Sequence, residues 1–303
     1  MVVMEDGFSL EHSTVGIVGL GLMGGSLAMA LKGKCARLIG FDSHPPALEL
    51  ALSKRIIDHA SASLPSPLGR GAGGEGELDL LILATPVPAI LHFLHHLPFT
   101  NNHPALSEAE GLPITLLDLG STKRDILQAM SALPANFSPL GGHPICGKEK
   151  LGIENASTDL YEGAPFVITP LARTTQHALR ITKQLIAAIG AHPIEMTAEE
   201  HDRILASTSH LPFLLSSALA HSTSPEFAPL IGPGFRSASR LAGTSSSMMM
   251  GVLQSNRENV LNALSEFQQQ LYEIKAALMR EDYSTLETIL DTSKSAYQNL
   301  TGN

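Results

Sequence analysis

One histidine in a glycine-rich segment is the first residue of this chain whose surroundings suit acid–base chemistry. His143 lies in the run 140–150, LGGHPICGKEK, and Pro144 follows it directly. Glycine and proline favour turns, so the run predicts a segment outside helix and strand interiors that presents the imidazole rather than packing it. Since histidine exchanges a proton near neutral pH, the segment predicts a general base. A histidine that only caps its loop is the alternative.

A serine at the end of an apolar run is the second candidate. Ser121 follows the run 114–120 and precedes a predicted helix over 124–133. A continuous apolar run of this kind is typical of a buried parallel strand. Ligands of open α/β sheets bind at the carboxyl ends of the strands, so Ser121 can contact a substrate there. It can also be the N-cap of the helix, and one serine can do both.

Three glycines near the start have the spacing of a dinucleotide-binding turn. Gly19, Gly21 and Gly24 fit G-x-G-x-x-G and lie between a short β-branched run, 13–18, and the helix-forming residues 27–32. The first glycine permits a tight turn, the second lets a pyrophosphate approach the backbone, and the third lets helix and strand pack closely. A glycine hairpin without a ligand is the alternative.

The strands that follow carry further cofactor candidates. The predicted strand 36–42 ends in Asp42, where a carboxylate can accept hydrogen bonds from an adenosine ribose. No arginine neighbours Asp42 to hold a ribose 2′-phosphate, which favours NAD over NADP. The apolar run 78–84 ends at Thr85 and Pro86, at the strand end expected near the cofactor. The expected cofactor contacts are Gly19, Leu20, Gly21, Met23, Gly24, Asp42, Thr85 and Pro86.

Composition narrows the class of protein. The chain has 303 residues, 44% of them hydrophobic and 16% charged, which is ordinary for a globular enzyme of two domains. Its net charge of −9 argues against a nucleic-acid partner. Two cysteines are too few for a disulfide framework, and no signal pattern or apolar run of ~20 residues is found. We expect a cytoplasmic protein with no membrane partner and no metal.

The chain divides into two predicted domains. Residues 1–196 read as an α/β, Rossmann-type doubly wound domain, which closes with strands at 166–170 and 192–196. Two glycine-rich or polar stretches, near 62–77 and 100–112, are expected to be flexible surface insertions. Residues 197–303 are expected to form an all-helical substrate and dimerisation domain.

The predicted helical domain shows caps and narrow apolar seams. Capping boxes of the S/T-x-x-E type begin at Thr197, Ser255 and Ser284. Apolar residues repeat at alternating spacings of four and three over 260–278, and a similar repeat covers 286–300. Narrow seams usually face another helix, so they predict a helical dimer interface or, equally, an intramolecular bundle.

Several motifs in order point to one family. These are the glycine turn and the segments DLGSTK (118–123), GGHPICG (141–147), SHLP (209–212) and GPGFRSASRL (232–241). Together they resemble the prephenate and arogenate dehydrogenases of tyrosine biosynthesis, from Val15 to about Leu278 apart from the two insertions. The resemblance implies NAD-dependent oxidative decarboxylation of prephenate to 4-hydroxyphenylpyruvate, CO₂ and NADH, by a homodimer formed through the C-terminal helices.

The resemblance also implies roles for particular residues. His143 would accept the proton of the substrate hydroxyl, and Ser121 would hydrogen-bond the same hydroxyl. Arg236, in a loop that opens with glycine and proline, would hold a substrate carboxylate in a bidentate fork. His210 would contact the pyruvyl side chain. Without the resemblance, a salt-bridged Arg236 and a core histidine at position 210 stay open.

Three more charged or titratable residues bear on the site. His201 and Asp202 are similar to a family pair in an ionic network between subunits, although spacing alone predicts an ordinary solvated helix face. Lys148 stands where many relatives carry threonine. We hypothesise that it attracts a second carboxylate or keto oxygen, which favours prephenate over arogenate because arogenate carries an ammonium group.

Two rival functions stay open. The same-class alternative is an arogenate dehydrogenase, and the alternative of another class is a catalytically silent NAD(H)-binding regulator. The joint presence of Ser121, His143 and Arg236 argues against the regulator, which would have no need of them. No further βαβ pattern follows toward Asn303, so the regulatory amino-acid-binding domain of some relatives is expected to be absent.

Overall fold

The computed structural model describes residues 9–62, 78–96, 112–148 and 150–302. Its first part is an eight-stranded sheet with the order β3-β2-β1-β4-β5-β6-β7-β8, in which only the β6–β7 pairing is antiparallel. The strands are β1 Thr14–Val18, β2 Arg37–Phe41, β3 His59–Ser61, β4 Leu80–Leu83, β5 Ile114–Asp118, β6 Phe137–Pro144, β7 Pro165–Pro170 and β8 His192–Glu195.

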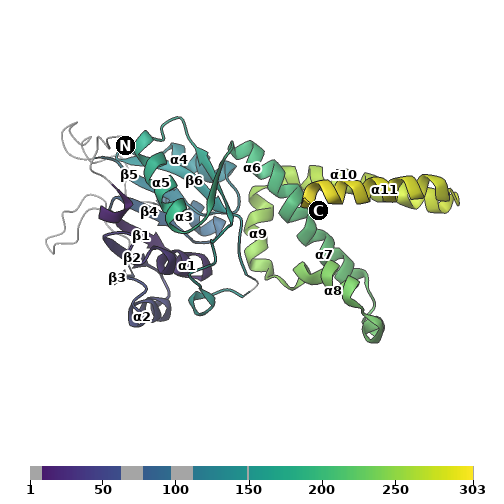
Figure 1. Ribbon diagram of the computed structural model, residues 1–303, viewed down its shortest axis with the longest axis horizontal. Coiled ribbons are helices and arrows are strands. Elements are labelled where there is room, and N and C mark those ends of the chain that lie inside the picture. The colour runs from purple at the N-terminus through teal and green to yellow at the C-terminus, as the bar shows by residue number, and fades with distance from the viewer. Residues whose placement is uncertain (1–8, 63–77, 97–111, 149, 303) are drawn as a thin grey trace.

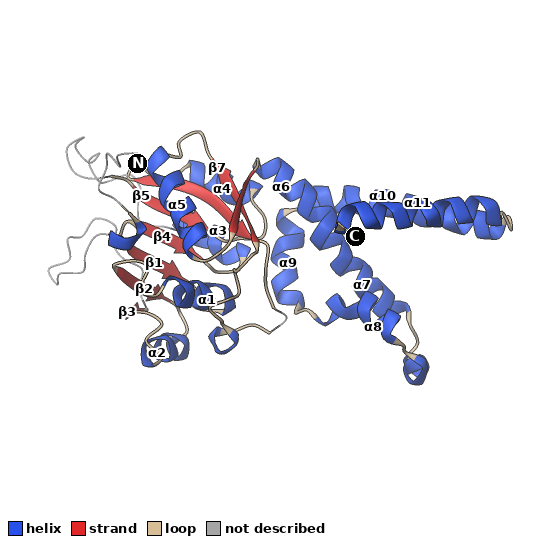
Figure 2. Ribbon diagram, viewed as in Figure 1, coloured by secondary structure: helices blue, strands red, loops and turns tan. Residues whose placement is uncertain are grey.

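Helices cover both faces of this sheet (Figure 2). They are α1 Leu22–Leu31, α2 Pro45–Ser53, α3 Val87–His96, α4 Arg124–Ser131 and α5 Gln176–Ala188. Side chains of α1, α2 and α5 belong to one apolar core, and those of α3 and α4 belong to a second. The continuous apolar runs of β1 and β4 lie between the two cores, because both faces of a doubly wound sheet are buried. The expected Rossmann-type architecture is confirmed.

The segment around His143 is a strand, so the predicted turn is wrong. His143 and the two glycines before it lie in β6, which pairs with β5 on one side and β7 on the other. A Cβ at Gly141 would lie 2.0 Å from Thr169 Oγ1, and one at Gly142 would lie 2.8 Å from the Asp118 carbonyl oxygen. These glycines are therefore needed for close approach of neighbouring strands, not for a left-handed turn.

The second part of the chain is helical, as expected (Figure 1). It contains α6 Ala198–Leu205, a π-helical turn Ala206–His210, α7 Leu211–Ser222, α8 Pro233–Ser239, α9 Ser246–Ser255, α10 Arg257–Met279 and α11 Tyr283–Thr301. The π turn ends two residues before Pro212, whose missing N–H and ring disturb the α-helical ladder upstream. Among the described residues no helix is both long enough and apolar enough to cross a bilayer.

Helices α10 and α11 pack as a hairpin that projects away from the sheet (Figure 1). Much of their apolar seam is uncovered in the single chain: Leu271 is 50% exposed, Leu290 56% and Leu300 86%. An intramolecular bundle would cover these side chains. The two predicted insertions fall almost entirely outside the described residues.

Only one of the three predicted capping boxes forms. Thr197 and Glu200 cap α6 reciprocally. The box at Ser255 is wrong, because that serine ends α9 and its hydroxyl donates to the Gly251 carbonyl. The box at Ser284 is also wrong, because Asp282, two residues earlier, caps α11 by accepting from the Thr285 N–H. At α11 an earlier residue takes the cap, whereas at α10 the N-cap Asn256 forms no side-chain cap.

Candidate active site

The glycine turn has the geometry that a dinucleotide needs. Gly19 has a φ of +91°, which a side chain would strain. A Cβ at Gly24 would lie 1.8 Å from the Gly19 carbonyl oxygen, so only glycine lets α1 pack this closely on β1. A Cβ at Gly21 would meet nothing within 4 Å, which leaves open space beside the backbone. Gly19 and Gly24 therefore have the conformation and the close packing that the fingerprint predicts, and the open space beside Gly21 fits the pyrophosphate contact that stays a prediction.

The surroundings of the turn also fit NAD. Helix α1 begins after Gly21 without a side-chain cap, so its first N–H groups are available to an anion. At the end of β2 the Asp42 carboxylate accepts from the backbone N–H groups of Leu20, at 2.7 Å, and His44, at 2.8 Å. Each oxygen keeps a further lone pair, which ribose hydroxyls could use. These residues would hold the adenosine and pyrophosphate of the cofactor.

The other predicted cofactor residues differ in what they offer. The Thr85 methyl group lies beside Gly19, and a Cβ at that glycine would come within 2.6 Å of it. Pro86 directly precedes α3 and is exposed. The Leu20 side chain is fully buried in the core, so only its backbone faces the turn. The Met23 carbonyl accepts from the Tyr161 hydroxyl at 2.7 Å, a hydrogen bond that helps to hold α1 in place.

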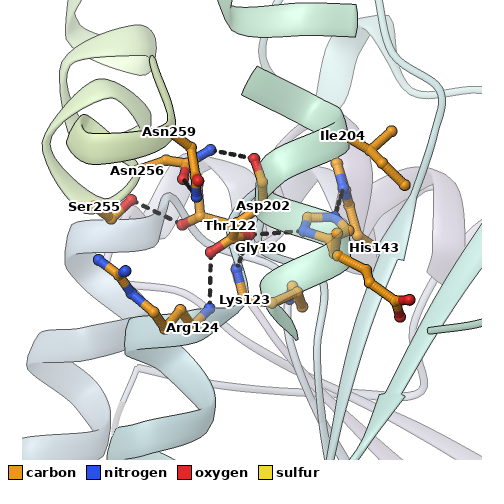
Figure 3. A network of polar contacts seen from close by, with 12 residues as sticks. Gly120, Thr122, Lys123, Arg124, His143, Asp202, Ile204, Ser255, Asn256 and Asn259 are labelled. Atoms are coloured by element: carbon orange, nitrogen blue, oxygen red, sulfur yellow. Dashed lines mark hydrogen bonds and ion pairs between the residues drawn. The ribbon is translucent and has the colours of Figure 1, made fainter. Parts of the chain in front are cut away.

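His143 is the first member of a chain of three titratable side chains (Figure 3). Its Nδ1 lies 2.8 Å from Nε2 of His201, and the two rings meet edge to face at 69°. Nδ1 of His201 in turn lies 2.7 Å from Oδ1 of Asp202. His143 comes from the sheet and the other two from α6, so the chain joins the two parts of the molecule.

Asp202 is held from three directions. Its two carboxylate oxygens accept from the backbone N–H groups of Lys123, at 2.7 Å, and Arg124, at 2.9 Å, at the start of α4. Its carbonyl accepts from Asn256 Nδ2 at 2.6 Å. His201 is 0% exposed and Asp202 1%, so the expected solvated helix face is wrong. Their spacing carried no sign of this, because the contact exists only once α6 packs against α4.

The surroundings set the charge of this chain. Burial first, and then electrostatic repulsion from His201, Lys123 and His210, hold the pKa of His143 well below its usual value, so the imidazole is neutral at neutral pH. Burial alone would raise the pKa of Asp202. Hydrogen bonds from His201 and from the two α4 N–H groups outweigh it and lower that pKa, so Asp202 is a carboxylate. A neutral imidazole is the form that can accept a proton.

A buried ion pair fixes the strand ends beneath His143. Lys123 Nζ donates to the Asp118 carboxylate and, at 2.7 Å, to the Gly142 carbonyl. Asp118 also accepts from the N–H groups of Gly120, at 2.8 Å, and Gly142, at 3.3 Å. Both charged side chains are 0% exposed. The pair locks β5 to β6 directly beside the histidine, a role that sequence reasoning missed although both residues lie in the DLGSTK motif.

Ser121 and His210 differ in how they relate to this network. Ser121 is half-buried at the carboxyl end of β5, but α4 is capped by Asp202, so the N-cap interpretation of Ser121 is wrong. His210 is 1% exposed, and its Nδ1 lies 3.2 Å from Asn256 Nδ2. Burial, opposed by the Asp202 charge and aided by repulsion from His201, lowers the pKa of His210 to about 4. His210 therefore shares Asn256 with the His143 network.

Two predicted substrate residues are not brought to His143. Arg236 is exposed on α8, a helix rather than the expected loop, which packs against α7 in the helical part of the chain (Figure 1). Lys148 is exposed, and its Nζ lies 2.7 Å from Ser157 Oγ and 3.4 Å from the Asn155 carbonyl oxygen. Among the described residues, hydrogen-bond or electrostatic contacts join His143 to His201, Lys123 and His210, whereas none joins it to Ser121, Arg236 or Lys148.

A dinucleotide turn on a doubly wound sheet, with a neutral histidine at the end of a nearby strand, defines an α/β oxidoreductase of the nicotinamide-dependent class. Comparison with known families gives the particular one. The family profile described as the nucleotide-binding domain of prephenate dehydrogenase matches residues 27–195, and that of its dimerization domain matches residues 197–292. The chain belongs to the prephenate dehydrogenase family.

Individual relatives agree with this assignment. The prephenate dehydrogenase of Bacillus subtilis is 32% identical over 93% of this chain and 74% of its own length, and that of Lactococcus lactis is 30% identical over 93% and 76%. A crystal structure of prephenate dehydrogenase from Aquifex aeolicus with hydroxyphenyl propionate and NAD+ has a TM-score of 0.82 at 29% identity, covering 97% of this chain and 100% of that one. Synechocystis arogenate dehydrogenase has a TM-score of 0.73 at 25% identity, covering 95% and 99%.

Proposed function

We propose that this protein catalyses the NAD-dependent oxidative decarboxylation of prephenate to 4-hydroxyphenylpyruvate and CO₂. One observation carries the proposal: a neutral, hydrogen-bonded His143 lies at the carboxyl end of the same sheet whose glycine turn fits NAD. Family membership and the named activity of the relatives support it.

This reaction requires no covalent bond between the protein and the substrate. Loss of CO₂ from the ring leaves an aromatic product, so the step is strongly downhill once hydride can leave. When bound, the nicotinamide supplies the acceptor for the hydride removed from the hydroxyl-bearing carbon. His143 takes the proton of that hydroxyl, and Ser121 hydrogen-bonds the same oxygen. The protein thus supplies positioning and a proton acceptor.

The test is NADH formation with prephenate and with arogenate, each with NAD and with NADP. We expect turnover of prephenate with NAD. Turnover of arogenate alone would keep the mechanism and change the substrate, an alternative that the likeness to Synechocystis arogenate dehydrogenase supports. No turnover of either substrate, with NAD still bound, would favour the silent NAD(H)-binding regulator.

Lys148 is proposed to favour prephenate over arogenate. Lys148→Thr is expected to lower the ratio of prephenate to arogenate kcat/KM by about fivefold, since an exposed ion pair is worth up to about 1 kcal/mol. Lys150→Thr, the neighbouring exposed lysine, is the matched control and should leave the ratio unchanged. An unchanged ratio in Lys148→Thr would show that this lysine serves only its contact with Ser157.

Arg236 is proposed to bind a substrate carboxylate in the site of the partner chain, because α8 packs against α7 within its own chain and is separate from β6, the strand that carries His143 (Figure 1). Arg236→Ala should raise KM by about 10- to 100-fold with little change in kcat, as expected for lost ground-state hydrogen bonds to a charged group.

Mixed dimers test whether Arg236 of one chain acts in the site of its partner, an arrangement called the crossing below. A dimer of one His143→Asn chain and one Arg236→Ala chain has one intact site if Arg236 acts on the partner, and none if it acts within its own chain. Activity recovered on mixing the two variants supports the crossing, whereas a mixture no more active than its parts contradicts it. NAD binding lost in Arg236→Ala would place the arginine in the cofactor site instead.

The dimer itself is proposed to form through α10 and α11. Their uncovered apolar seam and the family description of residues 197–292 as a dimerization domain support this. The boundary between the domains is proposed at 196–197, between the two family matches. The cytoplasmic location expected from the sequence stays a prediction. A light-scattering mass of twice that of the chain would support the dimer.

A further inference from the structure

We infer that His201 and Asp202 are positioning residues that hold His143 in the tautomer with a bare Nε2, ready to accept a proton. The catalytic meaning of this inference rests on the proposed function. The inference about the tautomer does not, because it follows from the order of donors and acceptors in the buried chain His143–His201–Asp202.

The order of hydrogen bonds starts at Asp202. A carboxylate can only accept, and Asp202 already accepts from two backbone N–H groups. His201 Nδ1 must therefore carry the hydrogen of the 2.7 Å bond to Oδ1. When His201 is in its neutral form its other nitrogen is then bare, so His201 Nε2 accepts from His143 Nδ1–H. A neutral His143 with hydrogen on Nδ1 has a bare Nε2.

Burial makes this order hard to reverse. His201 and Asp202 are 0% and 1% exposed, so water cannot readily replace either partner. The α4 N–H groups that hold Asp202 are parts of the backbone and cannot turn away as a side chain would. The backbone N–H groups at the start of α4 thus determine the tautomer of His143, acting through Asp202 and then His201.

The same chain gives the accepted proton somewhere to go. When His143 takes the substrate proton at Nε2, the hydrogen on Nδ1 can pass to His201 Nε2. One proton then arrives and one moves on, and the positive charge rests on His201 beside the Asp202 carboxylate. Lys123 and His210 also face His143, and neither supplies a negative charge. Asp202 is therefore the anion that offsets the cost of a cation in this site.

Two substitutions of His201 separate the two contacts. An asparagine amide nitrogen can take the place of Nδ1 and still donate to Asp202, but it leaves nothing to accept from His143. A glutamine amide oxygen can take the place of Nε2 and still accept from His143. We expect His201→Asn to lower kcat by about 10- to 100-fold with little change in KM, since it loses part of the effect of a positioned base. His201→Gln should stay within about fivefold of wild type, and His221→Asn, at an exposed histidine of α7, should match wild type.

The direct readout is the tautomer of His143, measured by two-bond ¹H–¹⁵N correlation spectra of histidine-labelled full-length protein without substrate. The His143 signals are assigned by their loss in His143→Asn. We expect hydrogen on Nδ1 in wild type and His201→Gln, and a mixed or reversed tautomer in His201→Asn. Hydrogen on Nε2 in wild type would overturn the inference. So would wild-type kcat in both His201 variants, or equal losses in both with the His143 tautomer unchanged. If wild type turns over neither substrate, the proposed function fails, while the spectra still decide the tautomer.

Discussion

Replacement of His143 by asparagine is expected to lower kcat by about 10²–10⁴-fold, the usual contribution of a general base. The amide cannot accept a proton at neutral pH, whereas the imidazole, whose pKa is lowered mainly by burial, is neutral there and keeps a nitrogen lone pair that can accept one. NAD affinity should stay close to that of wild type, since the glycine turn belongs to β1 and α1 and His143 belongs to β6.

Steady-state kinetics with prephenate, together with calorimetric titration of NAD, would measure both effects. His192→Asn is the matched control, because His192 is also a strand histidine but is exposed on β8 and should leave both quantities unchanged. A kcat within about threefold of wild type in His143→Asn would remove this residue from the role of base. Equal losses of kcat and NAD affinity would instead indicate damage to the sheet.

The second large effect is expected on stability. Lys123→Met should lower the free energy of unfolding by about 3–5 kcal/mol, because it leaves the Asp118 carboxylate buried without its cation. Burial already raises the pKa of Asp118, and the nearby Lys123 charge is the largest effect opposing that rise. The Gly142 carbonyl would also lose its donor.

Urea unfolding of matched variants would measure this cost. Lys183→Met removes a half-exposed ion pair with Glu195, at 3.8 Å, and should cost less than about 1 kcal/mol. The double variant Lys123→Met with Asp118→Asn should be more stable than Lys123→Met alone, since no buried charge is left over. If Lys123→Met cost no more than Lys183→Met, the buried pair would not be the lock between β5 and β6 described above.

Local patterns predicted the cofactor half of the molecule well. One apolar run, three glycines at fixed spacing and an acidic residue after the next strand predict the β1–α1–β2 unit. Each of these signals depends only on residues that are close in the sequence. Gly19 and Gly24 have the conformation and the close contact that the fingerprint assigns to them. The change to an all-helical composition after residue 196 was equally visible.

The site around His143 was harder to predict, because its contacts join distant parts of the chain. Glycines beside His143 suggested a turn, but the Thr169 hydroxyl and the Asp118 carbonyl require them in a strand. The spacing of His201 and Asp202 predicted a solvated helix face, but in the structure α6 packs against the start of α4 and buries both residues. Sequence spacing describes one element at a time, and both errors arose where a second element supplies the neighbour.

Because of the His143–His201–Asp202 chain, a chimaera that combines the sheet of this protein with the helical part of a relative must keep this contact between the two parts. A helical unit taken from a relative would have to bring its own equivalents of His201 and Asp202, aligned on a foreign α4, before the host histidine could act as a base. The first 196 residues on their own would lack His201 and Asp202, the two side chains that contact His143 and the start of α4. Turnover by such a chimaera would therefore require the sheet part and the helical part to pack correctly, and its kcat would measure whether they do.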